Sequence, residues 1–342
     1  MRPLSWTLAT TLACMILMAL GTSYAAAPVQ ITITGDDLAA GQVPPNPPFA
    51  PGSGISFRQG ARRPLAPFLT TIPAVPFGFY PGDVQNPSNN PTLRNIVVHN
   101  IFIDPYLTAS GGFSQGAAGC PTLTDADTFV DHLDKRNMLL LVNQYTGGTT
   151  AVLGQAGVIS YVSWRTQYDA DVAVLVHAAA RTFNPGGGLG HFYHIYFPQG
   201  TDVCTSGGGT SSFCYSPDNP ATFDFCAYHN FLQFTDGQGT AVFSVEPYAN
   251  VPGCRVPTSP AGASPNGPAI DSLANVVSHE TFEAISDPLL NAWFNRFGAF
   301  QGNEIGDECA FVFALPPVVL NGMPYQIQSE YSNTYHACSW VP

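Results

Sequence analysis

The chain has 342 residues, a formal net charge of −12 at pH 7 and only 10% charged residues. It contains a single lysine, Lys135, and no block of basic residues. An acidic, lysine-poor surface argues against binding to nucleic acids or to anionic membranes. The length allows one large hydrophobic core.

The first 25 residues have the features of a secretory signal peptide. Arg2 precedes an apolar run from Leu8 to Leu20, and small residues follow up to Ala25. We predict cleavage after about Ala25, which would leave no membrane attachment. A retained membrane anchor is the alternative, but the run is short and no cluster of positive residues follows it.

Cysteine usage also points to an oxidising compartment outside the cytoplasm. Disulfide bonds are expected there, and the odd number of cysteines after the signal peptide would leave one thiol over. The absence of C-x-x-C pairs argues against a zinc site made of cysteines. These seven cysteines are Cys120, Cys204, Cys214, Cys226, Cys254, Cys309 and Cys338.

Residues 26–92 are rich in proline and small residues, which predicts an extended arm or linker. The main domain is expected at residues 93–342. For this domain we predict an α+β fold with disulfide-stapled loops and a zincin-like active-site helix packed on a mainly antiparallel sheet. The expected elements are strands at 93–104 and 191–198, helices at 124–136 and 168–183, a strand or helix end at 138–145, and a central helix at 269–286.

The central helix and the residues after it hold most of the candidate chemistry, in the run SHETFEAISDPLLNAWFNRFGAFQGNEIGDEC. His279 and Glu283 are four residues apart, so on a helix they share one face and could bind one metal ion. Glu280 lies beside them as a candidate general base, which would take a proton from water on the metal. Glu304 is the candidate third ligand, and Asp307 could hold the outer nitrogen of His279.

The pattern H-E-x-x-E, a gap of about twenty residues and then N-E-x-x-D resembles the gluzincin metallopeptidases. This resemblance implies that His279, Glu283 and Glu304 bind the metal and that Glu280 is the base. Glu283 departs from the family pattern, which has a second histidine there. One imidazole and two carboxylates form a harder donor set, so Mn²⁺ or Ca²⁺ become alternatives to Zn²⁺. Asp287 would be a further ligand or a support for one.

Other candidate residues carry a weaker signal. His229, in the run CAYHNF, could be a further ligand or a catalytic hydrogen-bond donor. His194 and His336 are similar but weaker candidates, and an isolated histidine is more often a structural residue. The non-functional alternative for the whole run is a solvated or paired polar cluster without a metal.

A second resemblance covers about residues 93–342. The runs VVSHETFEAISDPLLNAWF, EIGDEC, FCAYHNF, PYANVPGC, TDADTFVDHL and IQSEYSN resemble the EXORDIUM/phosphate-induced protein family. The family implies an extracellular, cell-wall-associated protein without a settled reaction. We therefore predict a secreted metal-dependent hydrolase acting on a peptide or on cell-wall material. The alternative is a non-catalytic binding protein with a structural metal or a polar cluster.

Overall fold

The computed structural model describes residues 27–42, 55–57, 59, 82–103, 123–134, 138–160, 166–206, 212–260, 263–314 and 316–341. The predicted signal peptide, Cys120 and much of the predicted proline-rich arm lie outside these ranges. None of the helices in the described ranges combines the length and the hydropathy that a membrane span requires.

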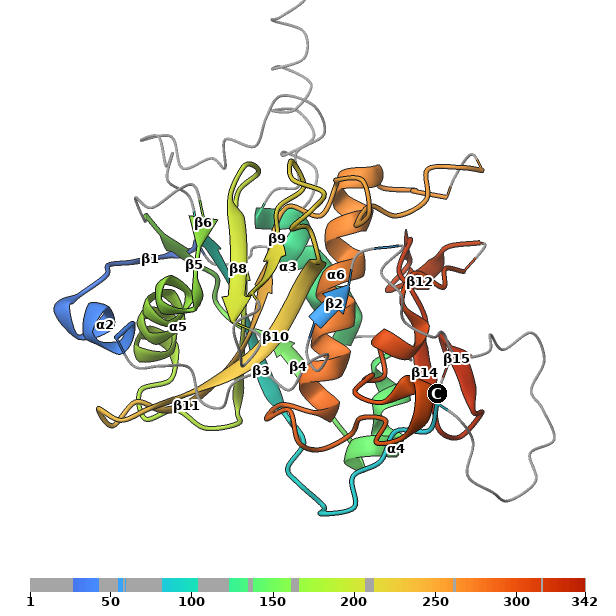
Figure 1. The fold of residues 1–342 in the computed structure, drawn as a ribbon, viewed down its shortest axis with the longest axis horizontal. Helices are drawn as coiled ribbons and strands as arrows, with labels where there is room; N and C mark the ends of the chain where they lie inside the picture. The colour runs from blue at the N-terminus through green and yellow to red at the C-terminus, as the bar shows by residue number, and fades with distance from the viewer. Residues whose placement is uncertain are drawn as a thin grey trace, which may run out of the picture.

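The core of the mixed α+β fold is an eight-stranded sheet in the order β1-β5-β3-β7-β11-β10-β2, with β4 paired to β3 (Figure 1). The central strands are buried on both faces. The strands are β1 (Val29–Ile31), β2 (Ile55–Phe57), β3 (Ile96–Ile103), β4 (Ala151–Leu153), β5 (Gly157–Ile159), β7 (His191–Tyr196), β10 (Phe225–Phe234) and β11 (Gly239–Glu246).

The prediction of a mainly antiparallel sheet is wrong. The neighbours from β1 through β11 are all parallel, and antiparallel pairing is found at β11–β10 and β10–β2. The physical reason is the helical crossover. After β3 the chain passes through α3 (Leu123–Asp134) before β4, and after β5 it passes through α5 (Asp169–Phe183) before β7. Such a crossover returns the next strand in the same direction.

Helices cover both faces of the sheet (Figure 1). On β7, Phe192 and Tyr196 pack with α3 and with α6 (Pro268–Ser286), whereas Tyr193 and Ile195 pack with α5 on the other face. Alternate side chains of a strand point to opposite faces, so each strand contributes to two separate cores. The α6 face is the one that carries the candidate chemistry.

Helix α6 confirms the predicted central helix to within one residue at its start. Pro268 occupies the first turn, where no intrahelical donor is needed, and Asp271 places a negative charge near the N-terminus. The helix ends at Asp287, whose N–H donates to the carbonyl of Glu283 at 2.6 Å, and Pro288 follows. Nearly every residue of the helix is buried, because the sheet covers one side and the C-terminal segment covers the other.

The remaining elements cover the edges of this core. The predicted strand or helix end at 138–145 is a pair of short helices, η1 and α4. These elements are η1 (Leu139–Val142), α4 (Asn143–Thr146), β6 (Thr166–Gln167), β8 (Asp202–Ser206), β9 (Ser212–Tyr215), η2 (Gly298–Phe300), η3 (Asp307–Cys309), β12 (Val318–Leu320), β13 (Met323–Tyr325), β14 (Glu330–Ser332) and β15 (Ala337–Ser339).

Three disulfide bonds confirm the predicted stapling of loops. Cys204–Cys214 joins β8 to β9, Cys226–Cys254 joins β10 to the loop after β11, and Cys309–Cys338 joins η3 to β15. Disulfide bonds persist in oxidising compartments, so they indicate an extracytoplasmic environment. The third bond fixes the segment that follows the candidate site.

Part of the predicted arm belongs to the folded core. Strand β1 pairs with β5, and α2 (Gly35–Ala40) packs on α5. The carboxylate of Asp37 is buried in this contact, where it accepts hydrogen bonds from Arg181 at 2.9 and 3.1 Å and lies 2.6 Å from Nδ1 of His177. Burial alone would raise the pKa of Asp37, but these partners outweigh it and lower the pKa to about 2.

We expect Asp37→Asn to destabilise the protein by about 3 kcal/mol at pH 7, because His177 and Arg181 would lose a buried carboxylate. A carboxyl whose pKa is lowered by folding stabilises the protein above its ordinary pKa of 3.8. That contribution disappears as the pH falls from about 4 towards 2, so the difference between variant and wild type should shrink there. Urea unfolding across this pH range measures the difference. The exposed neighbour Asp36, changed to Asn, is the control and should have little effect.

Candidate metal centre

Two histidines and four carboxylates gather around the C-terminal half of α6. His279, Glu280 and Glu283 come from the helix itself, and His229 comes from β10. Glu304 lies three residues before η3, and Asp307 is the first residue of η3. Each of these six side chains is at most 1% exposed. The site is therefore a buried polar cluster between the sheet, α6 and the C-terminal segment.

The sheet positions His229 through its strand register. His229 pairs with Ser244 on β11, Ser244 pairs with His194 on β7, and His194 pairs with Asn100 on β3. These four polar residues form one row across the sheet on the face towards α6. Thr281 of α6 meets this row, with its Oγ1 3.2 Å from Nε2 of His194.

His194 belongs to a separate, largely satisfied group. Its Nδ1 lies 2.7 Å from Oγ of Ser244 and 3.0 Å from Oε1 of Glu246, and the serine hydroxyl donates to the same glutamate oxygen at 2.8 Å. With Thr281 on its other nitrogen, His194 connects β7 and β11 to α6. This supports the structural interpretation of His194 rather than a catalytic one.

Glu283 is the residue on which the cluster converges. Its Oε1 lies 3.1 Å from Nε2 of His279, one helical turn earlier, and accepts a hydrogen bond from the backbone N–H of Asp307 at 3.0 Å. Its Oε2 makes no hydrogen bond within the described part of the chain and lies 3.5 Å from Nδ1 of His229. The two oxygens of one carboxylate therefore face two different histidines.

His229 lies between the helix and the sheet. Its Nε2 is 3.2 Å from the carbonyl oxygen of Asp287, and a carbonyl can only accept, so Nε2 carries the hydrogen. The other nitrogen, Nδ1, then has a lone pair. It makes no hydrogen bond within the described ranges and lies 3.5 Å from Oε2 of Glu280 and 3.5 Å from Oε2 of Glu283.

The structure thus brings together two overlapping groups that could hold a metal ion. One consists of His229, Glu283 and Glu304, and the other of His279, Glu283 and Asp307, with ligand atoms within 4.8 Å of one another in each group. Glu283 belongs to both. The set predicted from the sequence, His279 with Glu283 and Glu304, is divided between them. His229, predicted as a further ligand or a catalytic hydrogen-bond donor, belongs to the first group.

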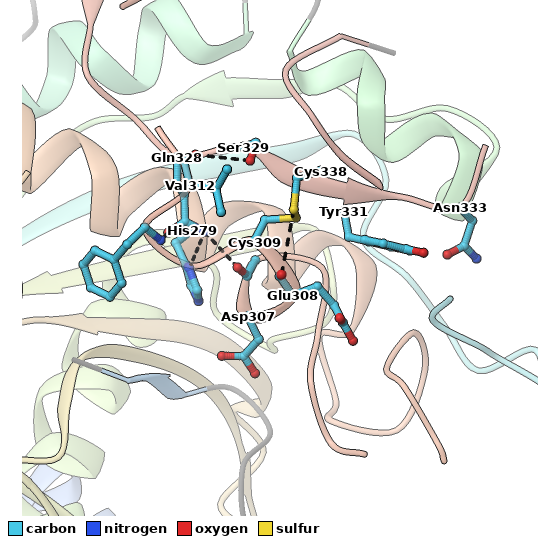
Figure 2. The surroundings of a disulfide bond; sticks show 12 residues. His279, Asp307, Glu308, Cys309, Val312, Gln328, Ser329, Tyr331, Asn333 and Cys338 are labelled. Atoms are coloured by element: carbon cyan, nitrogen blue, oxygen red, sulfur yellow. Dashed lines mark hydrogen bonds between the residues drawn. A yellow bond between two sulfur atoms is a disulfide. The ribbon is translucent and has the colours of Figure 1, made fainter. Parts of the chain in front are cut away.

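The outer nitrogen of His279 does not meet Asp307 as predicted. Its Nδ1 lies 2.9 Å from the amide nitrogen of Gln328, in the segment before β14 (Figure 2). Asp307 instead contributes its backbone N–H to Glu283, and its Oδ2 accepts from the N–H of Glu304 at 3.4 Å. Asp307 supports the turn that holds Glu304.

Asp287 supports the end of α6. Its Oδ1 accepts the backbone N–H groups of Asn291 at 2.6 Å and Ala292 at 2.5 Å, so the side chain closes the turn after the helix. Burial raises the pKa of Asp287 to about 6, despite these hydrogen bonds and the nearby His229. Because its carbonyl oxygen also contacts His229, Asp287 positions that ring rather than reaching the metal-binding groups itself.

The two glutamates of the helix have opposite electrostatic environments. Burial raises the pKa of Glu280 well above its ordinary value, and the charge of Glu283 raises it further. Burial would also raise the pKa of Glu283, but His279 and His229 outweigh it and hold that pKa well below the usual range. Glu283 is thus an anion, whereas Glu280 holds a proton readily, an acid–base difference typical of functional sites.

Burial lowers the pKa of His279, but Glu283 has the larger combined effect and raises the pKa to about 9. The amide of Gln328 opposes a second hydrogen on this ring. Its N–H group points at Nδ1, so a hydrogen on Nδ1 would face another donor instead of an acceptor. We therefore place a single hydrogen, on Nε2, facing Glu283.

Sequence analysis missed Gln328, Gly306 and Glu330. A Cβ atom at Gly306 would lie 2.9 Å from the ring of His279 and from Oε1 of Glu283, so any larger residue would displace these two side chains. Glu330 is fully buried, and burial raises its pKa well above the ordinary value. The alternating polar residues in QIQSE, at positions 326, 328 and 330, are the available signal, since they place three polar side chains on one face of an extended segment.

Comparisons with known proteins give no further guide to this site. No protein-family model matches the chain, and no curated protein or solved structure matches it significantly. The resemblances to the gluzincins and to the EXORDIUM family stay predictions. The function must therefore be argued from the buried cluster itself.

Proposed function

We propose that the protein is a secreted metal-dependent hydrolase, with Glu280 as the general base and a peptide bond as the bond that is cleaved. The observation that carries the proposal is the environment of Glu280. Its carboxyl group is fully buried next to a possible ligand set, yet neither oxygen makes a hydrogen bond within the described ranges. Burying a carboxyl group without hydrogen bonds destabilises the fold, and an apolar side chain would fill the same space without this cost. The presence of a glutamate there therefore favours a chemical role for Glu280.

The residues fit a divalent cation. His229 Nδ1 and Glu283 Oε2 are buried acceptor atoms without hydrogen bonds in the described part of the chain, and Glu304 belongs to the same group. One imidazole and two carboxylates suit Zn²⁺ or Mn²⁺, and Ca²⁺ less well because it prefers oxygen ligands alone. The cation would polarise the substrate carbonyl and acidify water. Glu280, whose Oε2 lies 3.5 Å from Nδ1 of His229, would accept the proton from that water.

The secreted location and the peptide substrate rest on different features. The predicted signal peptide and the three disulfide bonds support secretion. The resemblance of the HExxE and NExxD pattern to the gluzincins supports a peptide substrate, and the resemblance to the EXORDIUM family supports cell-wall material.

A second candidate function is a non-catalytic extracellular protein with a structural metal or a polar cluster, which acts by binding cell-wall material. The complete burial of the six cluster side chains favours it, since a catalytic metal keeps a position open to substrate whereas a structural site is closed. Catalysis would require the C-terminal segment over α6 to move and admit the substrate.

We expect the purified full-length protein to contain one Zn²⁺ or Mn²⁺ ion per chain, measured by elemental analysis. Removal of the ion by a chelator should abolish hydrolysis in a peptide and cell-wall substrate screen, and adding the ion back should restore it. A bound ion without any chelator-sensitive turnover would support the structural-metal function. A protein without a bound ion would leave the polar cluster as the remaining interpretation.

A further inference from the structure

We propose that His229, rather than His279, is the histidine that binds the metal, through Nδ1 and together with Glu283 and Glu304, and that His279 and Gln328 hold Glu283 in position. This inference rests on the metal of the proposed function and assigns its ligands. It replaces the histidine that the helix motif suggests with one from the sheet.

The orientation of the Gln328 amide excludes His279 as a ligand. The oxygen of this amide accepts the backbone N–H of Phe311 at 3.2 Å, and its nitrogen donates to the carbonyl oxygen of Gly306 at 2.9 Å. A flipped amide would set oxygen against oxygen and N–H against N–H. The second N–H of the amide therefore points at Nδ1 of His279, 2.9 Å away, and Nδ1 must accept it.

The hydrogen of the His279 ring then follows. A neutral imidazole carries one hydrogen, so with Nδ1 as acceptor the hydrogen is on Nε2. Nε2 lies 3.1 Å from Oε1 of Glu283, close enough for an ion-pair contact, although the pair does not have the geometry of a hydrogen bond. A cation at Nε2 would need the lone pair of that nitrogen, and the ring would have to lose both hydrogens. His279 therefore faces Glu283 with an N–H group rather than with a lone pair.

The position of His279 along α6 supports this role. Asp271, Asn275 and His279 are four residues apart and form one stripe of the helix. Oδ1 of Asp271 accepts the N–H of Gln326 at 3.3 Å, and Oδ1 of Asn275 accepts the N–H of Gln328 at 2.8 Å. His279 continues the stripe by accepting the side chain of Gln328. This stripe attaches the C-terminal segment to the helix.

His229 has the opposite arrangement of its two nitrogens. Its Nε2–H is donated to the carbonyl of Asp287, which leaves the lone pair of Nδ1 facing Oε2 of Glu280 and Oε2 of Glu283, each 3.5 Å away. This separation is longer than an N–H···O hydrogen bond, which is about 2.7–3.2 Å. Two ligand atoms bound tetrahedrally to one Zn²⁺ at about 2.0–2.1 Å would lie roughly 3.3 Å apart.

The two carboxylate oxygens of Glu283 then have different partners. Oε1 accepts the N–H of Asp307 and lies 3.1 Å from Nε2 of His279, and Oε2 is left for the metal. A histidine held by a carbonyl and a carboxylate held by donors on its other oxygen are the supports that metal ligands usually have. Glu304 belongs to the same group, with Oε1 3.7 Å from Nε2 of the His229 ring, so its carboxylate would have to turn towards Nδ1 to complete a set of one imidazole and two carboxylates around a divalent cation.

The test is a nuclear magnetic resonance measurement on the wild-type full-length protein, labelled with ¹⁵N-histidine and loaded with ¹¹³Cd²⁺ as the probe. We expect one histidine to show direct coupling to cadmium, and through Nδ1. Coupling through Nε2 would overturn the assignment and point to His279, and so would bound cadmium without coupling to any histidine. If no cadmium, zinc or manganese binds at all, the proposed function fails as well.

Three variants identify the coupled ring and separate ligand from positioning residue. His229→Gln should remove the coupling and weaken cadmium binding more than about 100-fold. His279→Ala and Gln328→Ala should keep the Nδ1 coupling and weaken binding about 10- to 100-fold, as expected for a residue behind a ligand. Because Gln328 acts on the metal site through His279, the double variant should lose little more affinity for cadmium than either single variant. Loss of the coupling in His279→Ala but not in His229→Gln would overturn the proposal.

His191→Asn is the matched control, since His191 pairs with His99 at the start of β7 and should leave both coupling and affinity unchanged. Circular dichroism of each variant monitors the fold. The wild-type spectrum decides between Nδ1 and Nε2 without any substitution, so a variant that fails to fold does not remove the test.

Discussion

Glu280→Gln is expected to lower the rate of hydrolysis by about 10²- to 10⁴-fold, the usual contribution of a general base. Glutamine keeps the shape of the side chain but cannot accept a proton. Metal content should not change, because the proposed ligands are His229, Glu283 and Glu304. Steady-state rates on the best substrate from the screen, together with elemental analysis, measure both quantities on the same preparation.

The stability of this variant is informative as well. Burial raises the pKa of Glu280, and a carboxyl whose pKa is raised by folding destabilises the protein as the pH rises above its ordinary pKa of 4.5. In the metal-free protein at pH 7, Glu280→Gln should therefore be at least as stable as wild type in urea unfolding. An inactive variant that is also unfolded would not support a role as base.

Glu246→Gln is the matched control for Glu280→Gln. Glu246 is also a buried glutamate on the α6 side of the sheet, but it bonds to His194 and Ser244. We expect this variant to lose stability while its turnover stays within a few-fold of wild type. If Glu280→Gln keeps full turnover, or if both variants lose it equally, Glu280 is not the base.

The sequence predicts the position of α6 well, because the information is local. Pro268 marks the start of the helix, Asp287 and Pro288 mark its end, and the four-residue spacing places His279 and Glu283 on one face. The turn with Glu304 and Asp307 is close enough in sequence to be associated with the helix. What this local pattern cannot give is the direction in which the nitrogens of His279 point.

The rest of the site depends on pairings that are distant in sequence. His229 faces α6 because β10 pairs in register with β11, and β11 lies parallel to β7. Gln328 is 49 residues after His279, and the two meet where the C-terminal segment crosses the helix. The parallel direction of the sheet escaped prediction for the same reason, since it depends on which strands become neighbours rather than on the residues within each strand.

Glu283→Ala should have the largest effect on stability of any single substitution in the site, about 3–5 kcal/mol. It removes the carboxylate that accepts the N–H of Asp307 and that lies against both His279 and His229, so three buried polar groups lose a neighbouring charge together. Urea unfolding in the presence of a chelator measures this loss without a contribution from bound metal. A loss below about 1 kcal/mol would contradict the central position of Glu283.

Glu283→Gln separates the structural role of this residue from its metal. With its oxygen towards His279 and Asp307, the glutamine amide would keep the hydrogen bond from Asp307 and the contact with His279, and its N–H₂ group would face the lone pair of His229 Nδ1. We therefore expect a metal-free stability close to that of wild type. Affinity for Zn²⁺ or Mn²⁺ should nevertheless fall more than about 100-fold, because the amide nitrogen replaces the ligand oxygen and the negative charge is lost. A stable Glu283→Gln variant that binds metal as tightly as wild type would show that the metal lies elsewhere. A stable variant without metal would show that folding depends on the polar contacts of Glu283, whereas metal binding depends on its charge.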